Sequence, residues 1–226
     1  MFKSIKTGVL ALILISTAII VKAQQKISEG VITYGMEYNL TADQQQMANF
    51  LPKETVIKFK DNLSRIEMEQ GPAIIKIISD KTSKTGLLLV DIPIVQKQYA
   101  VKMSKEEMEK GKEGSPKFSD FKATGEKQKI GNYNAEKYTH KDDKGGDYEL
   151  WASTDIELPE GYKEAEYKDV KGTLVKFTMF QNGIRSVLTL KSIKAEQVPP
   201  LSLDIPRGYE LKTMAEMKAM QSGGGR

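Results

Sequence analysis

Apolar and polar residues alternate along most of this chain, which is typical of strands with one buried and one wet face. In residues 31–38 one face carries Ile32, Tyr34, Met36 and Tyr38. An Asn-Gly pair at 182–183 joins two such stretches and predicts a tight hairpin. The pattern predicts about eleven mostly antiparallel strands. They cover residues 31–38, 55–60, 65–69, 73–79, 87–91, 98–103, 133–140, 148–153, 173–180, 184–194 and 201–205.

Helical patterns are few. Thr41 is a plausible cap for a helix over 41–49, which would carry Met47 and Phe50 towards one side. Ser104, with Glu107 three residues later, forms a capping box and predicts a helix over 104–110. A third helix is predicted over 212–220, where methionines recur every three residues.

The first 23 residues have the features of a cleavable signal peptide. Lys3 and Lys6 precede the apolar run 9–21, and 21–23 form a cleavage-like site that leaves Gln24 as the new N-terminus. The alternative is an uncleaved membrane anchor, but the apolar run is shorter than the roughly 20 residues that span a bilayer. We therefore expect a periplasmic protein, with secretion beyond the outer membrane left open.

Composition limits what the exported part can be. Residues 1–23 carry three lysines and no acid, so their removal lowers the net charge from +4 to +1 and leaves no electrostatic argument for nucleic acid binding. The chain has no cysteine, hence neither disulfides nor a lipid-modified cysteine. We expect one domain over 24–221 and a flexible tail over 222–226. The mature protein should be a soluble monomer without stable membrane insertion.

Residues that could support catalysis or metal binding are scarce. His140 is the single histidine, and without a nucleophile elbow it is better interpreted as an exposed strand-end residue than as a catalytic one. Asp142, Asp143, Asp147 and Glu149 could surround calcium, but their order does not fit an EF-hand and a solvated hairpin tip explains them better. We expect no enzyme activity, no catalytic residue, no metal and no cofactor.

Large apolar side chains on one predicted sheet face and one helix are the candidate binding residues. Methionine adapts to variable apolar partners, so this face could hold an acyl chain. The alternative is an ordinary core under the helices, which composition alone favours. The candidate residues are Tyr34, Met36, Met47, Phe59, Met68, Tyr99, Phe177 and Met179.

Four segments carry a family resemblance: 51–68, 99–104, 124–138 and 203–211. Together they resemble an uncharacterised family of exported Bacteroidota proteins, which is itself similar to the periplasmic lipoprotein carriers of the LolA/LolB type. The resemblance implies an unclosed antiparallel β-barrel of about eleven strands, a mainly β (α+β) fold with helices covering a concave apolar face. Such carriers shield lipid acyl chains from water.

One departure concerns charge. The carriers rely on an arginine near the strand that here ends in Lys60, and lysine lacks the forked hydrogen bonding of arginine. Arg65 should point to the polar face, so the role is assigned to neither residue. The expected function is non-catalytic binding or carriage of a lipid, a lipoprotein acyl chain or another hydrophobic ligand. The alternative is an envelope protein-interaction or scaffold module on the same fold with a filled core.

Overall fold

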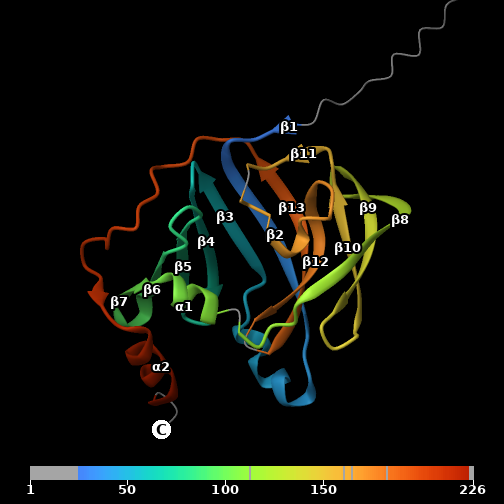
Figure 1. Ribbon diagram of the computed structural model, residues 1–226. Coiled ribbons are helices and arrows are strands. Elements are labelled where there is room, and N and C mark those ends of the chain that lie inside the picture. Colours follow the sequence, from blue (N-terminus) through green and yellow to red (C-terminus); the bar gives the residue numbers. More distant parts are fainter. Residues whose placement is uncertain (1–24, 112, 160, 164, 182, 224–226) are drawn as a thin grey trace, which may run out of the picture.

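A computed structural model describes residues 25–111, 113–159, 161–163, 165–181 and 183–223 (Figure 1). The predicted signal peptide lies outside these residues. The described chain is mainly β and is built around one large sheet that does not close on itself.

Twelve strands form this sheet in the order β14-β7-β6-β5-β4-β3-β2-β13-β12-β10-β9-β8, so β14 and β8 are its two edges. Neighbouring strands are antiparallel except β14, which runs parallel to β7. The strands are β2 (Glu29–Asn39), β3 (Glu54–Lys60), β4 (Leu63–Gln70), β5 (Ala73–Asp80), β6 (Gly86–Ile92), β7 (Lys97–Met103), β8 (Phe118–Ile130), β9 (Tyr133–Asp142), β10 (Asp147–Ser153), β12 (Thr173–Gln181), β13 (Ile184–Lys194) and β14 (Glu210–Leu211).

Short elements complete the fold. Two of them, β1 (Gln25–Lys26) and β11 (Ile156–Glu157), pair in parallel as a separate two-stranded sheet. The helices are η1 (Ala42–Phe50), η2 (Pro93–Val95), α1 (Lys105–Lys110), η3 (Ala165–Tyr167) and α2 (Met214–Gly223), where η marks a 3₁₀ helix.

Strand register defines the two faces of the sheet. Direct partners share a face, and the pairs Tyr34–Thr55, Ile57–Ile66 and Ile77–Leu88 define one side of β2 to β6, called here the inner face. The other side, the outer face, carries ion pairs such as Lys58–Glu67 at 3.2 Å.

Both ends of the inner face are covered. At the β7 end, Met108 of α1 and Met217 of α2 pack in one apolar cluster with Tyr99 and Val101. Towards β2, Tyr162 covers the fully buried Phe59 with ring centroids 5.0 Å apart. The α1 helix and the segment containing η3 lie in front of the strands in Figure 1.

The structure confirms the local sequence signals. Strands β2 to β7 form an antiparallel meander, and β12 pairs with β13 across the Asn-Gly turn. Ser104 caps α1: its Oγ accepts from the backbone N–H of Glu107 at 3.2 Å, and its own N–H donates to the Glu107 carboxylate at 2.8 Å.

Four details differ from the sequence-based predictions. Residues 201–205 form no strand, because their alternating apolar side chains pack on the outer face beside β6 and β7 without pairing. The helix expected over 41–49 is the 3₁₀ helix η1. Strand β8 was missed because most of its side chains are exposed and polar, so alternation is absent. The α2 helix also continues to Gly223, into the tail expected to begin at Ser222.

Candidate functional site

A cavity of about 150 Å³ opens where η1 meets the inner face. Met36 of β2, Met68 of β4 and Met47 of η1 line it together, with Tyr38 and Ile184 beside them. Three of the eight predicted residues therefore meet at one small site. Met36 and Met68 are half-buried and Met47 is 44% exposed.

Hydrogen bonds hold η1 in this position. The Tyr38 hydroxyl donates to the carbonyl of Pro52 at 2.7 Å, just after the helix, and burial raises the pKa of Tyr38 to about 12. The Gln44 side chain donates to the carbonyl of Gly183 at 3.3 Å and so ties η1 to the β12–β13 hairpin. No residue of η1 is buried, so these polar contacts, rather than a packed face, locate the helix.

Most of the other predicted residues belong to the core. Tyr34 is 5% exposed, its hydroxyl donates to the carbonyl of Leu174 at 2.9 Å, and its ring contacts Phe177 edge-on at 5.6 Å. Phe59 and Met179 pack in the same cluster as Tyr34 and Phe177. Tyr99 lies apart from them, in the cluster beneath α1 and α2.

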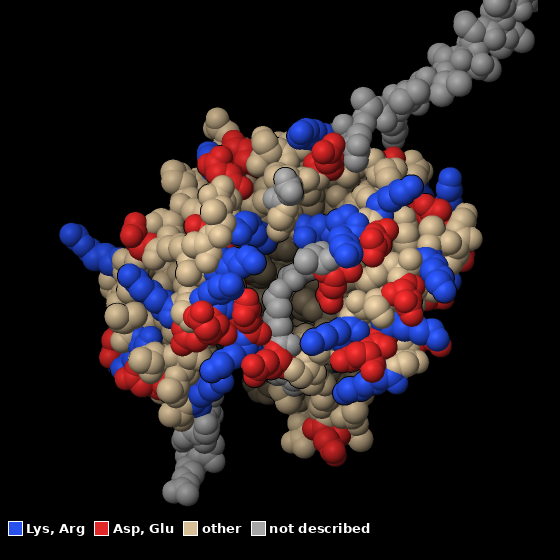
Figure 2. Space-filling model, in the orientation of Figure 1, with Lys and Arg blue, Asp and Glu red and all other residues tan. Residues whose placement is uncertain are grey.

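A stretch of the inner face between these covered ends is apolar and half-buried. Figure 2 shows this side of the molecule with a hollow near its middle, tan at the bottom and surrounded by Lys, Arg, Asp and Glu. The half-buried apolar side chains of this stretch are Ile57, Ile66, Met68, Ile75, Ile77 and Leu88. The isoleucines were not among the predicted binding residues, although their alternation in the predicted strands places them on the inner face.

His140 is buried, so its interpretation as an exposed strand-end residue was wrong. Its side chain is 3% exposed and stacks on Phe121 at 4.9 Å, with Phe118 edge-on at 4.9 Å. Desolvation lowers the pKa of His140 to about 4. Both phenylalanines belong to β8. Because that strand was not predicted, nothing in the sequence-based predictions indicated the side chains that bury His140.

The acidic residues at the β9–β10 turn have a structural explanation. The Asp142 carboxylate accepts from the backbone N–H of Gly146 at 2.6 Å and of Lys144 at 2.9 Å, and from the Tyr148 hydroxyl at 3.0 Å. These bonds, chiefly the one from Gly146, lower the pKa of Asp142. Within the described residues, no group of three or more His, Asp or Glu side chains is placed to hold a metal ion.

The chain matches no family model and no curated protein. Across the described residues, no helix is both long and apolar enough to cross a membrane. Any function must therefore be argued from the geometry of the sheet and its cavities.

Proposed function

We propose that this chain is a non-catalytic periplasmic protein that binds or carries a hydrophobic ligand, such as a lipid or a lipoprotein acyl chain, on the inner face of its sheet. The observation that supports this most is the methionine-lined cavity beside η1, which continues the half-buried apolar stretch of the inner face. An apolar surface with a polar rim is typical of sites that bind an acyl chain or another apolar ligand.

The energetics favour an extended apolar ligand. Each CH₂ group removed from water contributes about 0.8 kcal/mol, so several methylenes along the inner face give useful affinity. The cavity of about 150 Å³ is smaller than the pockets of roughly 300–1,000 Å³ that enclose drug-sized ligands. The ligand would place one part of its chain between Met36, Met47 and Met68 and the rest along the half-buried isoleucines. Methionine side chains can rearrange around it at low cost.

The carrier-like fold is part of the same proposal. An unclosed antiparallel sheet with α1 and α2 seated on its inner face agrees with the architecture that the LolA/LolB resemblance implies. Lys60, at the end of the strand near which those carriers have their arginine, pairs with Glu29 at 2.8 Å. The proposal therefore covers a carrier-like fold and a hydrophobic ligand, and it assigns no role to a basic residue.

A second candidate function is supported by a different observation. The β6–β7 turn exposes Ile94 and Val95, with 83% and 55% of their surface free, and Leu211 of β14 is 60% exposed beside β7. Exposed apolar residues of this kind are typical of interaction sites. A scaffold module that contacts an envelope protein through this corner, with the inner face serving only as core, is the alternative.

An acyl probe tests the first function. Residues 24–226 would be purified from a bacterial periplasm, examined by native mass spectrometry and solvent extraction, and then titrated with a fluorescent fatty acid. Met47→Asp places a charge in the cavity from an exposed helix that contributes nothing buried to the fold. The matched control is Met220→Asp in α2, whose side chain is 42% exposed and does not line the cavity.

We expect co-purifying lipid or saturable probe uptake, weakened about tenfold or more by Met47→Asp and unchanged by Met220→Asp. A native mass without bound lipid, together with no uptake of the probe, would contradict ligand binding. The protein-interaction module would then be the remaining candidate function. Cross-linking from the Ile94–Val95 turn would then search for its partner.

A further inference from the structure

Strands β10 and β12 separate along much of their length. They pair only where Trp151, Ala152 and Ser153 meet residues 173–176, and a register shift lies between Trp151 and Ala152. Beyond that bulge, residues 147–150 of β10 pair only with β9, and residues 177–181 of β12 pair only with β13. The described chain therefore contains two strand edges that face each other without a mutual ladder. The Phe180 carbonyl accepts a hydrogen bond from the Ser115 hydroxyl at 3.3 Å, and edge N–H and C=O groups without such a partner need water or a ligand.

A cleft of about 640 Å³ lies over this gap. Side chains from the outer face line it, including Thr139, Trp151, Lys176, Thr178 and Arg185. Its volume falls within the roughly 300–1,000 Å³ of small-molecule sites. It is separate from the methionine-lined cavity beside η1, with which it shares no lining residue.

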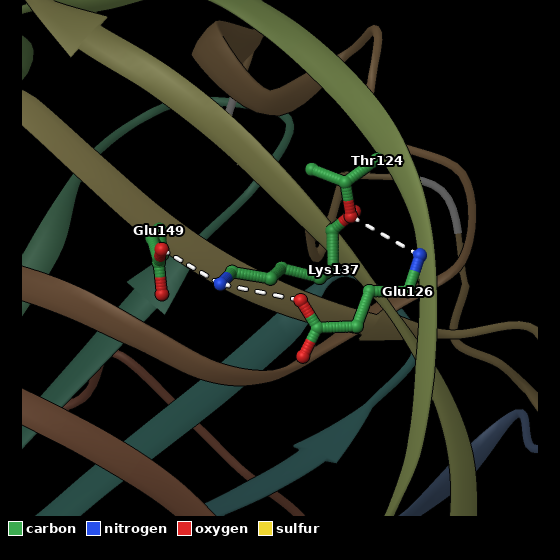
Figure 3. A network of polar contacts seen from close by, with 4 residues as sticks. All are labelled: Thr124, Glu126, Lys137 and Glu149. Carbon is green, nitrogen blue, oxygen red and sulfur yellow. Dashed lines mark hydrogen bonds and ion pairs between the residues drawn. The ribbon is translucent and has the colours of Figure 1, made fainter.

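The acidic groups at this cleft already have partners. Figure 3 shows Lys137 of β9 between Glu149 of β10 and Glu126 of β8. Its Nζ lies 2.7 Å from the Glu149 carboxylate and 3.4 Å from that of Glu126. Asp147 is largely exposed and has Lys141 at 3.9 Å. Lysines therefore lie beside both carboxylates that line the cleft, and the close pair is the one that Glu149 makes with Lys137.

The two basic residues of the cleft are unpaired. Among the described residues, neither Arg185 nor Lys176 has a carboxylate within ion-pair distance, and the buried Nε of Arg185 has no hydrogen-bond partner. The Arg185 guanidinium lies over the Tyr148 ring, 5.0 Å from its centroid. Stacking of this kind holds the planar group in place while its N–H donors stay free to bind an anion.

We propose that this cleft binds a small organic anion, with its phosphate or carboxylate group at Arg185 and Lys176 and an apolar ring against the aromatic floor. Arg185 and Thr178 share the outer face of β12 and β13 with Lys176, because Phe180–Arg185 and Thr178–Val187 are direct pairs. Charge-assisted bonds from arginine to such groups are among the strongest in proteins. The aromatic rings of Tyr148, Trp151 and Phe177 supply the apolar surface. The threonine hydroxyls and free strand edges supply further donors.

Trp151 makes the test specific. It is the only tryptophan of the chain and it lines the cleft, so its fluorescence responds to occupancy there. Because Trp151 also packs in the core cluster with Tyr34 and Phe59, the cleft variants decide where the ligand is bound. Residues 24–226 would be titrated with phenyl phosphate, benzoate, inorganic phosphate and the neutral benzyl alcohol, each at constant ionic strength set with choline chloride. Isothermal titration calorimetry repeats every titration as a second readout.

We expect saturable binding of phenyl phosphate or benzoate, tighter than that of inorganic phosphate, and none of benzyl alcohol. Arg185→Gln should raise the Kd at least tenfold. Lys176→Gln removes an exposed side chain, so the fold does not depend on it, and it should also raise the Kd. The matched control Lys194→Gln removes one charge from the end of β13 outside the cleft and should leave the Kd within twofold.

Absence of saturable binding for all three anions in both readouts would overturn the proposal. So would binding that Arg185→Gln and Lys176→Gln leave unchanged, because the anion would then lie elsewhere. If Lys194→Gln raised the Kd as much as the two cleft variants do, the binding would reflect general electrostatic attraction. That result would also overturn the proposal of a specific anion site.

Discussion

Burial of the single histidine should make the stability of this protein depend on pH in a defined window. His140 is 3% exposed among aromatic rings, and its Nδ1 has no hydrogen-bond partner within the described residues. The surroundings hold the imidazole neutral, with its pKa lowered from 6.5 to about 4 by desolvation. Between these two values the unfolded chain binds a proton that the folded chain does not.

The direction and size of the effect follow from this difference. Well above pH 6.5 both states are neutral and the histidine costs nothing. As the pH falls, protonation of the unfolded state lowers the free energy of unfolding, by about 2 kcal/mol at pH 5 and about 3 kcal/mol at pH 4. Below the folded-state pKa the penalty levels off.

The assay compares the wild type with His140→Phe and His140→Gln in urea denaturation followed by circular dichroism at pH 7, 6, 5 and 4. Neither variant titrates at this position, and neither loses a bond at Nδ1. Carboxylates titrate alike in all three proteins, so the difference between wild type and variant isolates the histidine. Two variants are used because phenylalanine risks overpacking, whereas glutamine is smaller and polar.

We expect the wild type to lose about 2 kcal/mol more than either variant between pH 7 and pH 5. Parallel pH profiles for the wild type and both variants would refute the reasoning. Because the chain has one histidine, its NMR titration gives a single curve. A midpoint near 6.5 would refute the reasoning equally.

Three further predictions concern stability. Phe59→Ala removes a fully buried ring that contacts Tyr162 and should cost about 3–5 kcal/mol, measured by chemical denaturation; a loss below 1 kcal/mol would show that the site collapses freely. Gly172→Ala should be much more destabilising than Gly183→Ala in the same experiment. Both glycines have positive φ, which costs other residues about 1–2 kcal/mol, but only the Cβ at 172 would lie 2.2 Å from a backbone oxygen. Equal losses would contradict that clash. Ser104→Ala removes the cap of α1 and should lower stability by about 1 kcal/mol, whereas Ser104→Asp, a good cap, should keep it.

The sequence predicted much of the fold and part of the site. Alternation located β2 to β4, because each of those strands has one mainly apolar and one mainly polar side. The next strands are apolar on both sides, as the successive buried residues Tyr99, Ala100 and Val101 of β7 show. Alternation also placed Met36 and Met68 on the same face, as their strands show. Whether Tyr34 and Phe59 line an open groove or fill a core was left open, and the structure places both in the core. That outcome depends on the segment containing Tyr162, which no pattern within β2 or β3 reveals.

What the sequence by itself determined is local: strand positions, the hairpin at the Asn-Gly turn and the cap at Ser104, since each depends on residues a few positions apart. The tertiary structure alone decided where β8 lies, and so the burial of His140. It also decided that Met47 joins Met36 and Met68, and that β10 and β12 separate beyond Trp151. Each of these results depends on contacts between residues distant in the chain. Such contacts follow from how the whole sheet curves and what covers it, and no short stretch of sequence carries that information.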